Sequence, residues 1–364
     1  MPGSSVQAAP AFDPLKAAFY GQLVNAAYAM YDNDPTNPAP KPPSPLPGDY
    51  NFVAWVQMKD FIFNYGNWTC YGLIAQNPSG ANDYVLAIRG TSDWVEWWDD
   101  LTSMVLTPMP GFGEVGYGFY SIYQTLRVVR PGKALAAGAA LATESLEPVG
   151  TFADQVAAAV QQHAAESRPS GKAAAEAASA KTSVVVTGHS LGSALATLYV
   201  AQNSQSNKVI TPLLSTLASP RVGDWTFKTT FDGLGIPSWR IVNEPDIIPN
   251  TPFFGFWHIK TKHEYDSDSM TIAWPECWHS IYTYLHLLDP SQPLSQSCLH
   301  WDAAAVAPLR TRIRPPLRTP ALPAAPAGEK EFALTASVAL PACGAATSLS
   351  GTDEAVSMDI HDGL

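Results

Sequence analysis

The stretch SVVVTGHSLGSALATL at residues 183–198 contains the pattern that decides the fold. It begins with Ser183 and a run of β-branched residues at 184–187, which is typical of a strand buried on both faces. The pattern Gly-x-Ser-x-Gly follows at 188–192, and good helix formers occupy 194–198. A strand, this pentapeptide and a helix in that order place a serine on a sharp turn at a strand end. We therefore predict that Ser190 is a nucleophile on such a turn.

The residues around Ser190 also suit the chemistry of an exposed serine. Glycines two positions before and after it allow neighbouring backbones to pass closely. A helix that begins at Leu191 directs its first free amides toward the place where negative charge would develop. The Leu191 amide is therefore one expected donor of an oxyanion hole.

Other segments of the chain predict the rest of a sheet and its helices. Strand patterns alternate with helical periodicity, which favours a mostly parallel central sheet flanked by helices. Together with the turn at Ser190, this predicts the α/β class and an α/β-hydrolase fold. The strands are expected at 52–57, 70–75, 84–88, 183–187, 213–218 and 239–242, and the helices at 12–31, 118–127 and 152–165.

Length and composition suggest one large domain with an appendage. We expect the hydrolase domain over residues 1–302, and a Pro/Ala-rich linker with a weakly structured C-terminal extension over 303–364. An Ala-rich insertion at about 132–180 has few large apolar residues, so it is expected to supply surface helices rather than core.

Charge and hydropathy argue against nucleic acid as a partner and against a membrane-spanning segment. The net charge is −11 and charged residues are only 15% of the chain, which disfavours nucleic acid as a partner. No apolar run approaches the roughly 18 residues of a membrane span, so no transmembrane segment is expected. Residues 1–13 contain no basic residue and no apolar central segment, so no secretory leader is indicated. The default expectation is a cytoplasmic protein, or an extracellular one if a leader was trimmed.

The four cysteines are too few and too scattered for a disulfide framework or a metal site, and no metal or cofactor is expected. Cys277 and Cys298 flank one helix-like segment. They are either bridged, in an oxidising compartment, or ordinary reduced thiols.

A nucleophilic serine needs an imidazole to take its proton and a carboxylate to orient that imidazole. In α/β-hydrolases the acid follows the serine in the chain and the histidine comes last. Asp246 lies in a proline-framed loop directly after the strand at 239–242, so it is the expected acid. Glu244 in the same loop and Asp224 on the preceding loop are the alternatives.

His279 is the expected base, because it follows a loop break at Pro275 and immediately precedes a helical pattern at 281–285. His258 is interpreted instead as a strand residue in the alternating run 256–259, with a structural hydrogen bond. The remaining alternatives are His286, His263 and His300.

The buried strand at 84–88 leads into Arg89-Gly90-Thr91. A glycine at a strand end allows the backbone to approach a substrate oxygen closely. Thr91 is therefore the second expected oxyanion donor. An aromatic stripe follows at i, i+3, i+4 and i+7, formed by Trp94, Trp97, Trp98 and Leu101. Such a stripe belongs either to a core helix or to a lid over the pocket. Its position after the strand at 84–88, which carries the expected oxyanion residue, favours the lid. Together with Ile248 these residues are the expected substrate contacts.

These motifs together resemble the class 3 lipase family over roughly residues 84–290. The motifs that carry the resemblance are Arg89-Gly90-Thr91, Gly116-Tyr117-Gly118-Phe119, residues 188–192, residues 218–223 (ASPRVG) and the loop 243–249. The resemblance implies Ser190, Asp246 and His279 as the catalytic residues, Thr91 as an oxyanion residue, and a lid at about 92–101.

The expected reaction is hydrolysis of a lipid ester through an acyl-Ser190 intermediate, at a lipid–water interface and in the manner of a triacylglycerol lipase. The family includes phospholipases and feruloyl esterases, so a phospholipase A1 or a feruloyl or polyester esterase is the alternative. A noncatalytic lipid-binding protein on the same fold is the remote one.

Overall fold

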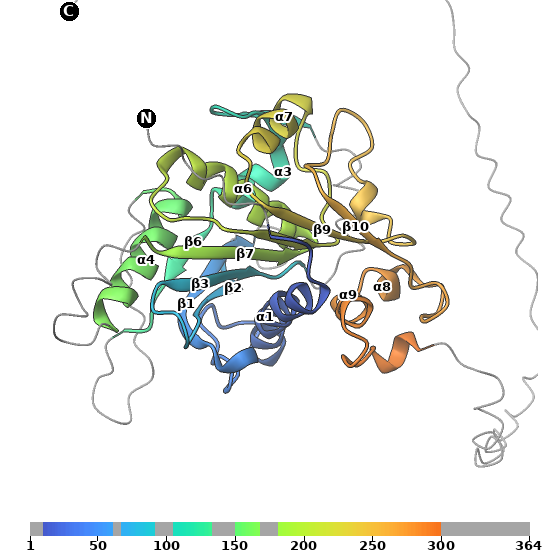
Figure 1. The fold of residues 1–364 in the computed structure, drawn as a ribbon, viewed down its shortest axis with the longest axis horizontal. Coiled ribbons are helices and arrows are strands. Elements are labelled where there is room, and N and C mark those ends of the chain that lie inside the picture. The colour runs from blue at the N-terminus through green and yellow to red at the C-terminus, as the bar shows by residue number, and fades with distance from the viewer. Residues whose placement is uncertain (1–9, 61–66, 92–104, 133–149, 168–180, 300–364) are drawn as a thin grey trace, which may run out of the picture. The chain divides into compact units, whose positions relative to one another are not determined.

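The computed structural model describes residues 10–60, 67–91, 105–132, 150–167 and 181–299. Within these ranges the chain forms a layered α/β structure with an eight-stranded sheet at its centre (Figure 1). The strands of this sheet are β1 (Asn51–Asp60), β2 (Asn67–Gln76), β3 (Asp83–Ile88), β6 (Arg127–Val129), β7 (Ser183–His189), β8 (Leu214–Leu217), β9 (Ser238–Asn243) and β10 (Lys262–Tyr265).

The order of the strands across the sheet is β10-β9-β8-β7-β3-β2-β1-β6. The five strands from β10 to β3 are parallel, and β2, β1 and β6 extend the sheet with antiparallel pairs. In open parallel sheets, ligands bind beyond the carboxyl ends of the strands. The segments after β3, β7, β8 and β9 therefore lie where a site is expected.

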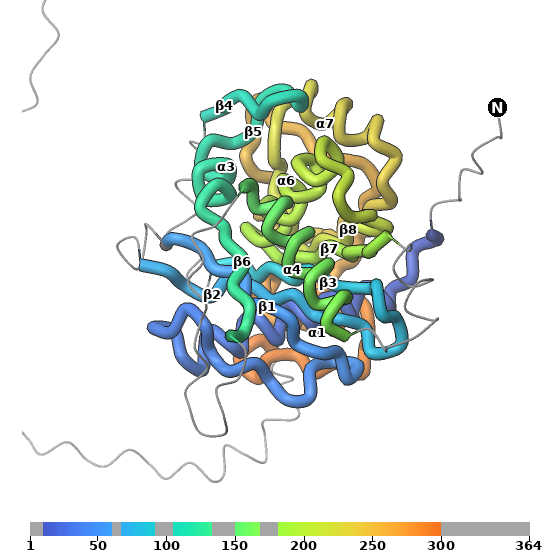
Figure 2. Tube along the Cα trace, turned by 90° about the vertical axis from the view of Figure 1, so that its left-hand side faces the viewer, coloured from blue at the N-terminus to red at the C-terminus, as the bar shows by residue number. Residues whose placement is uncertain are grey.

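Two layers of helices cover the sheet, and the two turned views agree on their sides (Figures 1 and 2). One face packs against α3 (Tyr117–Tyr123), α4 (Phe152–Glu166), α6 (Leu191–Ser206) and α7 (Trp225–Gly233). The opposite face packs against α1 (Pro14–Asn33) and α9 (Ile281–Leu288). Helix α1 begins at Pro14, and the side chain of its N-cap Asp13 accepts from the Lys16 amide.

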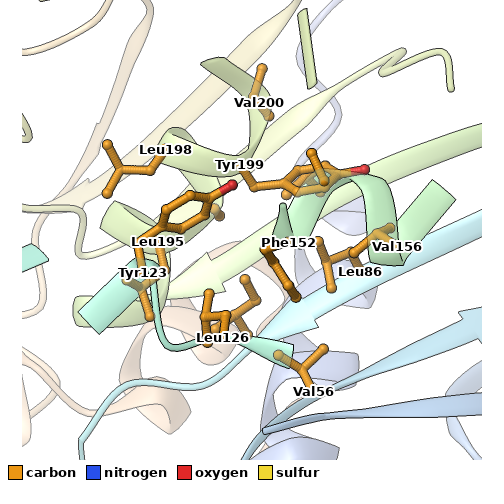
Figure 3. Packing of buried hydrophobic residues seen from close by; sticks show 14 of the residues in the cluster. Val56, Leu86, Tyr123, Leu126, Phe152, Val156, Leu195, Leu198, Tyr199 and Val200 are labelled. Carbon is orange, nitrogen blue, oxygen red and sulfur yellow. The ribbon is translucent and has the colours of Figure 1, made fainter. Parts of the chain in front are cut away.

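Helix α4 contributes to the core, so the expectation that the Ala-rich segment supplies only surface helices is wrong for this helix. Figure 3 shows Phe152 and Val156 of α4 among the side chains of α6 and of the sheet. The ring of Phe152 lies 5.8 Å from that of Tyr123 and 5.7 Å from that of Tyr199, both at steep angles. Thr151 and Asp154 form a capping box at the start of this helix, which fixes where the apolar face begins.

The remaining elements connect the layers and include two departures from the sequence expectations. Residues 118–127 do not form one helix, because α3 ends at Tyr123 and the chain turns into β6. The run 256–259 is not a strand, since only an isolated bridge joins Trp257 to Gly223. The short elements are η1 (Pro47–Asp49), β4 (Leu106–Met109), β5 (Gly113–Gly116), η2 (Ile248–Asn250), α8 (Pro275–Trp278) and η3 (Gln296–Cys298).

A search of the described residues for a helix that is both long and apolar enough to span a membrane finds none.

Candidate active site

Ser190 occupies a strained turn between β7 and α6. Its backbone has φ 55° and ψ −127°, a conformation that residues with side chains rarely adopt. The glycines on either side have no room for a side chain. A Cβ on Gly188 would lie 2.4 Å from the Gly192 oxygen, and one on Gly192 would lie 2.3 Å from the Ile88 oxygen. The Gly-x-Ser-x-Gly spacing is therefore a packing requirement of the turn.

The structure brings Ser190, His279 and Asp246 together from three separate loops. His279 Nε2 lies 2.8 Å from Ser190 Oγ, and His279 Nδ1 lies 2.8 Å from Asp246 Oδ2. The exposed fractions of the three residues are 6%, 5% and 2%, respectively. This is the arrangement in which an imidazole can take a proton from the hydroxyl while a buried carboxylate fixes its orientation.

Asp246 lies just beyond the end of β9 and has further donors. Its Oδ1 accepts from the Ile248 amide at 3.0 Å, and its Oδ2 also accepts from the Tyr284 hydroxyl at 2.8 Å. Ile248, an expected substrate contact, is 2% exposed and packs in the core cluster on the α6 side of the sheet.

His279 lies between α8 and α9, at the C-terminal cap of the first helix and one residue before the N-cap Ser280 of the second. A disulfide joins Cys277, two residues before His279, to Cys298 in η3. The bridged alternative for these two cysteines is therefore the one that the structure contains.

The alternative acids and bases lie elsewhere in the fold. Glu244 is exposed, and Asp224 is the N-cap of α7, where it accepts from the Phe227 amide. His258 binds the Pro249 carbonyl, His263 stacks on Phe12, and His286 binds the Gln292 carbonyl. His300 is outside the described residues.

The two expected oxyanion residues flank the serine turn. Leu191 is the first residue of α6, where amides have no partner within the helix, and it is 3% exposed. Thr91 is half-buried and follows Gly90, whose position is tightly constrained. A Cβ on Gly90 would lie 2.9 Å from Ser190 Cβ and 3.0 Å from the His189 oxygen. The backbone after β3 thus lies against the serine.

A buried arginine, for which the sequence indicated no specific role, fixes this backbone. The Arg89 side chain is enclosed by rings, with its guanidinium carbon 3.8 Å from the Tyr31 centroid and 4.1 Å from the Tyr71 centroid. It donates to the Gly90 carbonyl at 2.7 Å and to the Cys70 carbonyl at 2.9 Å. The sequence signal that could have indicated this role is the position of an arginine directly after a buried apolar strand.

Of the expected substrate contacts, Trp94, Trp97, Trp98 and Leu101 lie outside the described residues. In the part of the chain that the structure describes, no group of three or more metal-binding side chains occurs.

Comparison with known proteins relates the segment that carries Ser190 and Asp246 to one family. Residues 85–256 match the profile of the family described as Lipase (class 3). Over these residues the chain has the sequence pattern of a class 3 lipase. Phospholipase A1-II 3 of Oryza sativa subsp. indica is 30% identical over 252 residues, which cover 62% of this chain and 54% of that protein. The chloroplastic phospholipase A(1) DAD1 of Arabidopsis thaliana is 25% identical over 292 residues, 71% of this chain and 59% of that protein. The chain thus spans little more than half the length of these relatives.

A solved structure supports the fold. The native Rhizomucor miehei lipase propeptide complex superposes with a TM-score of 0.50 at 22% identity, over 81% of this chain and 85% of that one. The fold is therefore of the α/β-hydrolase type. Both α1 and His279 lie outside the residues that match the family profile.

Proposed function

We propose that this protein is a serine carboxylic ester hydrolase that acts on lipid esters. The observation that carries the proposal is the continuous contact from Ser190 Oγ through both nitrogens of His279 to Asp246 Oδ2, at 2.8 Å in each step. A lipid ester is the proposed substrate because the family profile is that of lipases.

In the proposed reaction, Ser190 Oγ attacks the ester carbonyl carbon while His279 Nε2 takes the hydroxyl proton. The Asp246 carboxylate accepts from Nδ1–H and stabilises the imidazolium. The amides of Thr91 and Leu191 bind the oxygen that becomes negative, a contribution of about 3 kcal/mol per donor in such sites. The carbon–oxygen bond to the alcohol then breaks, and the alcohol leaves with the proton from His279. Water attacks the acyl-serine by the same steps and releases the acid.

The first test is the role of Ser190. Replacing Ser190 with Ala should abolish hydrolysis of a chromogenic ester and phosphonylation by an organophosphonate probe, while the circular dichroism spectrum stays that of wild type. Ser204→Ala is the matched control, because Ser204 lies on α6 and its hydroxyl donates to the Ala201 carbonyl one turn before it. Retained hydrolysis in the Ser190 variant would refute the assignment. A wild-type protein that the probe does not label would favour the noncatalytic lipid-binding alternative.

Two lipid classes are candidates for the natural substrate. Triacylglycerols are the first, because the matched family profile is that of lipases. Phospholipids are the second, because the curated relatives carry the name phospholipase A1. Fatty acid release from triolein emulsions and from phosphatidylcholine vesicles, measured with one enzyme preparation, separates the two.

A third substrate class, feruloyl esters or polyesters, is tested with p-nitrophenyl esters of increasing chain length. A lipid substrate predicts rates that rise toward longer acyl chains and increase above the micellar concentration. Rates that fall from butyrate to decanoate, with no increase above that concentration, would favour the feruloyl or polyester alternative.

A further inference from the structure

His189, the residue before the serine, is fully surrounded and bonded on both ring nitrogens. It is 3% exposed, and it ends β7. Its Nδ1 lies 2.9 Å from the Tyr28 hydroxyl of α1, and its Nε2 lies 2.9 Å from the backbone oxygen of His279. The same Tyr28 hydroxyl lies 2.8 Å from the Gly90 amide. Four segments therefore meet in one chain of hydrogen bonds.

The chemistry of the two ends determines the direction of every bond in this chain. The His279 carbonyl can only accept, so His189 Nε2 carries the proton. In a neutral imidazole, Nδ1 then accepts, so the Tyr28 hydroxyl donates to it. The Tyr28 oxygen remains free to accept from the Gly90 amide, as observed. Each donor in the chain has an acceptor, and no alternative arrangement of protons satisfies all three bonds with a neutral ring.

A neutral His189 is also what its surroundings favour. Burial lowers the pKa of His189 well below its ordinary value, and the neighbouring His279 lowers it further, against the hydrogen bond to the His279 carbonyl. Burial raises the pKa of Tyr28, so its hydroxyl stays a donor. The two histidine rings lie 4.9 Å apart, and a charged His189 would repel the imidazolium that His279 forms during the reaction.

This chain of hydrogen bonds joins the parts of the site that must keep a fixed spacing. Gly90 precedes the oxyanion residue Thr91 and is held at its amide by Tyr28 and at its carbonyl by Arg89. His279 is held at its own backbone carbonyl by His189. His189 is covalently joined to Ser190. A displacement of about 1 Å in such a site can lower a rate about a hundredfold.

We propose that Tyr28 and His189 are positioning residues. They hold the oxyanion strand, which is β3 with Gly90 and Thr91 after it, and the backbone at His279 at fixed distances from Ser190. Helix α1, which lies outside the residues that match the family profile, is then part of the active site. This inference rests on the proposed ester hydrolysis.

Tyr28→Phe is the first test, because it removes one oxygen and keeps the ring beside Arg89. We expect kcat on p-nitrophenyl esters to fall about tenfold or more with KM within about twofold, since substrate binding surfaces stay in place. Tyr84→Phe is the matched control. Tyr84 is also buried and its hydroxyl also binds a histidine Nδ1, that of His163, at 3.0 Å, on the far side of the sheet from α1. It should lose stability but keep wild-type kcat.

His189→Gln is the second test and remains informative if Tyr28→Phe does not fold. A glutamine that places its amide nitrogen near the former Nε2 can still donate to the His279 carbonyl, but its amide oxygen then no longer lies at the former Nδ1 position, where it would accept from Tyr28. Adding Tyr28→Phe to this variant should therefore change kcat less than about twofold, a strongly non-additive result. Wild-type kcat in Tyr28→Phe, equal kcat losses in the Tyr28 and Tyr84 variants, or additive losses in the double variant would each overturn the proposal.

Phosphonate labelling separates this inference from the proposed function. Wild-type Ser190 that resists the probe would contradict ester hydrolysis itself. Wild-type Ser190 that reacts, together with at least a severalfold slower reaction in Tyr28→Phe, supports the positioning role. A reaction at equal rates in both proteins would contradict that role while leaving the proposed function intact.

Discussion

The hydroxyl of Tyr284 donates to Asp246 Oδ2 at 2.8 Å, the same carboxylate oxygen that binds His279 Nδ1. Tyr284 is completely buried in α9, and its oxygen also accepts from the Asn243 amide at 3.0 Å. Burial, followed by the nearby Asp246 charge, raises the pKa of Tyr284 well above its ordinary value, so the hydroxyl remains a donor. Helix α9, which follows His279 in the sequence, thus also orients the acid through Tyr284.

Replacing Tyr284 with Phe should lower kcat about tenfold with little change in KM. A hydrogen bond to a charged group contributes about 1.5–3 kcal/mol, and its loss lets the carboxylate rotate away from His279. The measurement is steady-state hydrolysis of a p-nitrophenyl ester. Tyr282→Phe is the control, because Tyr282 lies on the same helix with 41% of its surface exposed. Equal kcat values in the two variants would contradict the orienting role.

The sequence predicted the sheet and the residues of the candidate triad because both leave local signals. The β-branched run before Ser190 and the glycines around it reflect burial and backbone crowding, which act over a few residues. Asp246 and His279 were chosen by chain order and by their positions after a strand and before a helix. The bond between Tyr28 and His189 spans 161 positions, so no local pattern could indicate it.

Gly90→Ala should strongly lower the rate of ester hydrolysis without unfolding the protein. An added Cβ would lie 2.6 Å from the Tyr28 oxygen and 2.9 Å from Ser190 Cβ, so the oxyanion strand must move away from the serine. We expect a loss of at least about a hundredfold in kcat/KM, comparable to the loss of an oxyanion donor. Gly233→Ala is the control, since a Cβ there meets nothing within 4 Å. A Gly90 variant with near-wild-type kcat/KM would show that the strand tolerates displacement.

The fold should lose stability as pH falls below about 6.5 in part because of His258. Burial, followed by the charge of Arg240, lowers the pKa of His258 to about 3, against the hydrogen bond to the Pro249 carbonyl. The unfolded chain binds a proton at this residue near pH 6.5 and the folded chain does not. The contribution of the neutral ring is therefore complete above that pH and decreases as the pH falls toward 3, by at most about 1.4 kcal/mol per unit.

Urea unfolding at pH 7, 6 and 5 measures this dependence. His258→Gln can still donate to the Pro249 carbonyl but does not titrate, so its free energy of unfolding should fall less steeply with decreasing pH than that of wild type. His189 is altered in neither protein, and its own contribution cancels in the comparison. Parallel slopes in the two proteins would contradict the low pKa of His258.

The Ala-rich segment shows why composition misjudged one helix. Alanine-rich sequence suggested a surface position, yet Phe152 and Val156 lie on one face of α4 and pack against α6. Small alanines on that face let the helix approach closely, so a few large side chains are enough to bury it. Whether this helix is buried depends on the shape of the surface that it packs against. The composition of a sequence does not reveal that shape.

The disulfide between Cys277 and Cys298 should stabilise both the fold and the position of His279. It closes a loop with a sequence separation of 21 that contains α9, and one of its ends is two residues from His279. Restricting an unfolded loop of this size contributes about 3 kcal/mol in the chain-entropy account. The Cys277→Ser, Cys298→Ser double variant should therefore unfold at a lower urea concentration and lose kcat before it unfolds.

Reduction provides the matched experiment. Dithiothreitol should shift the unfolding midpoint and kcat of the wild type toward those of the double-serine variant, and should leave the variant itself unchanged. Cys70→Ala is the control for the thiol that is free and buried among the described residues, and its response to dithiothreitol should equal that of wild type. If the double variant keeps wild-type kcat below its unfolding transition, the disulfide stabilises the fold without holding His279 in place.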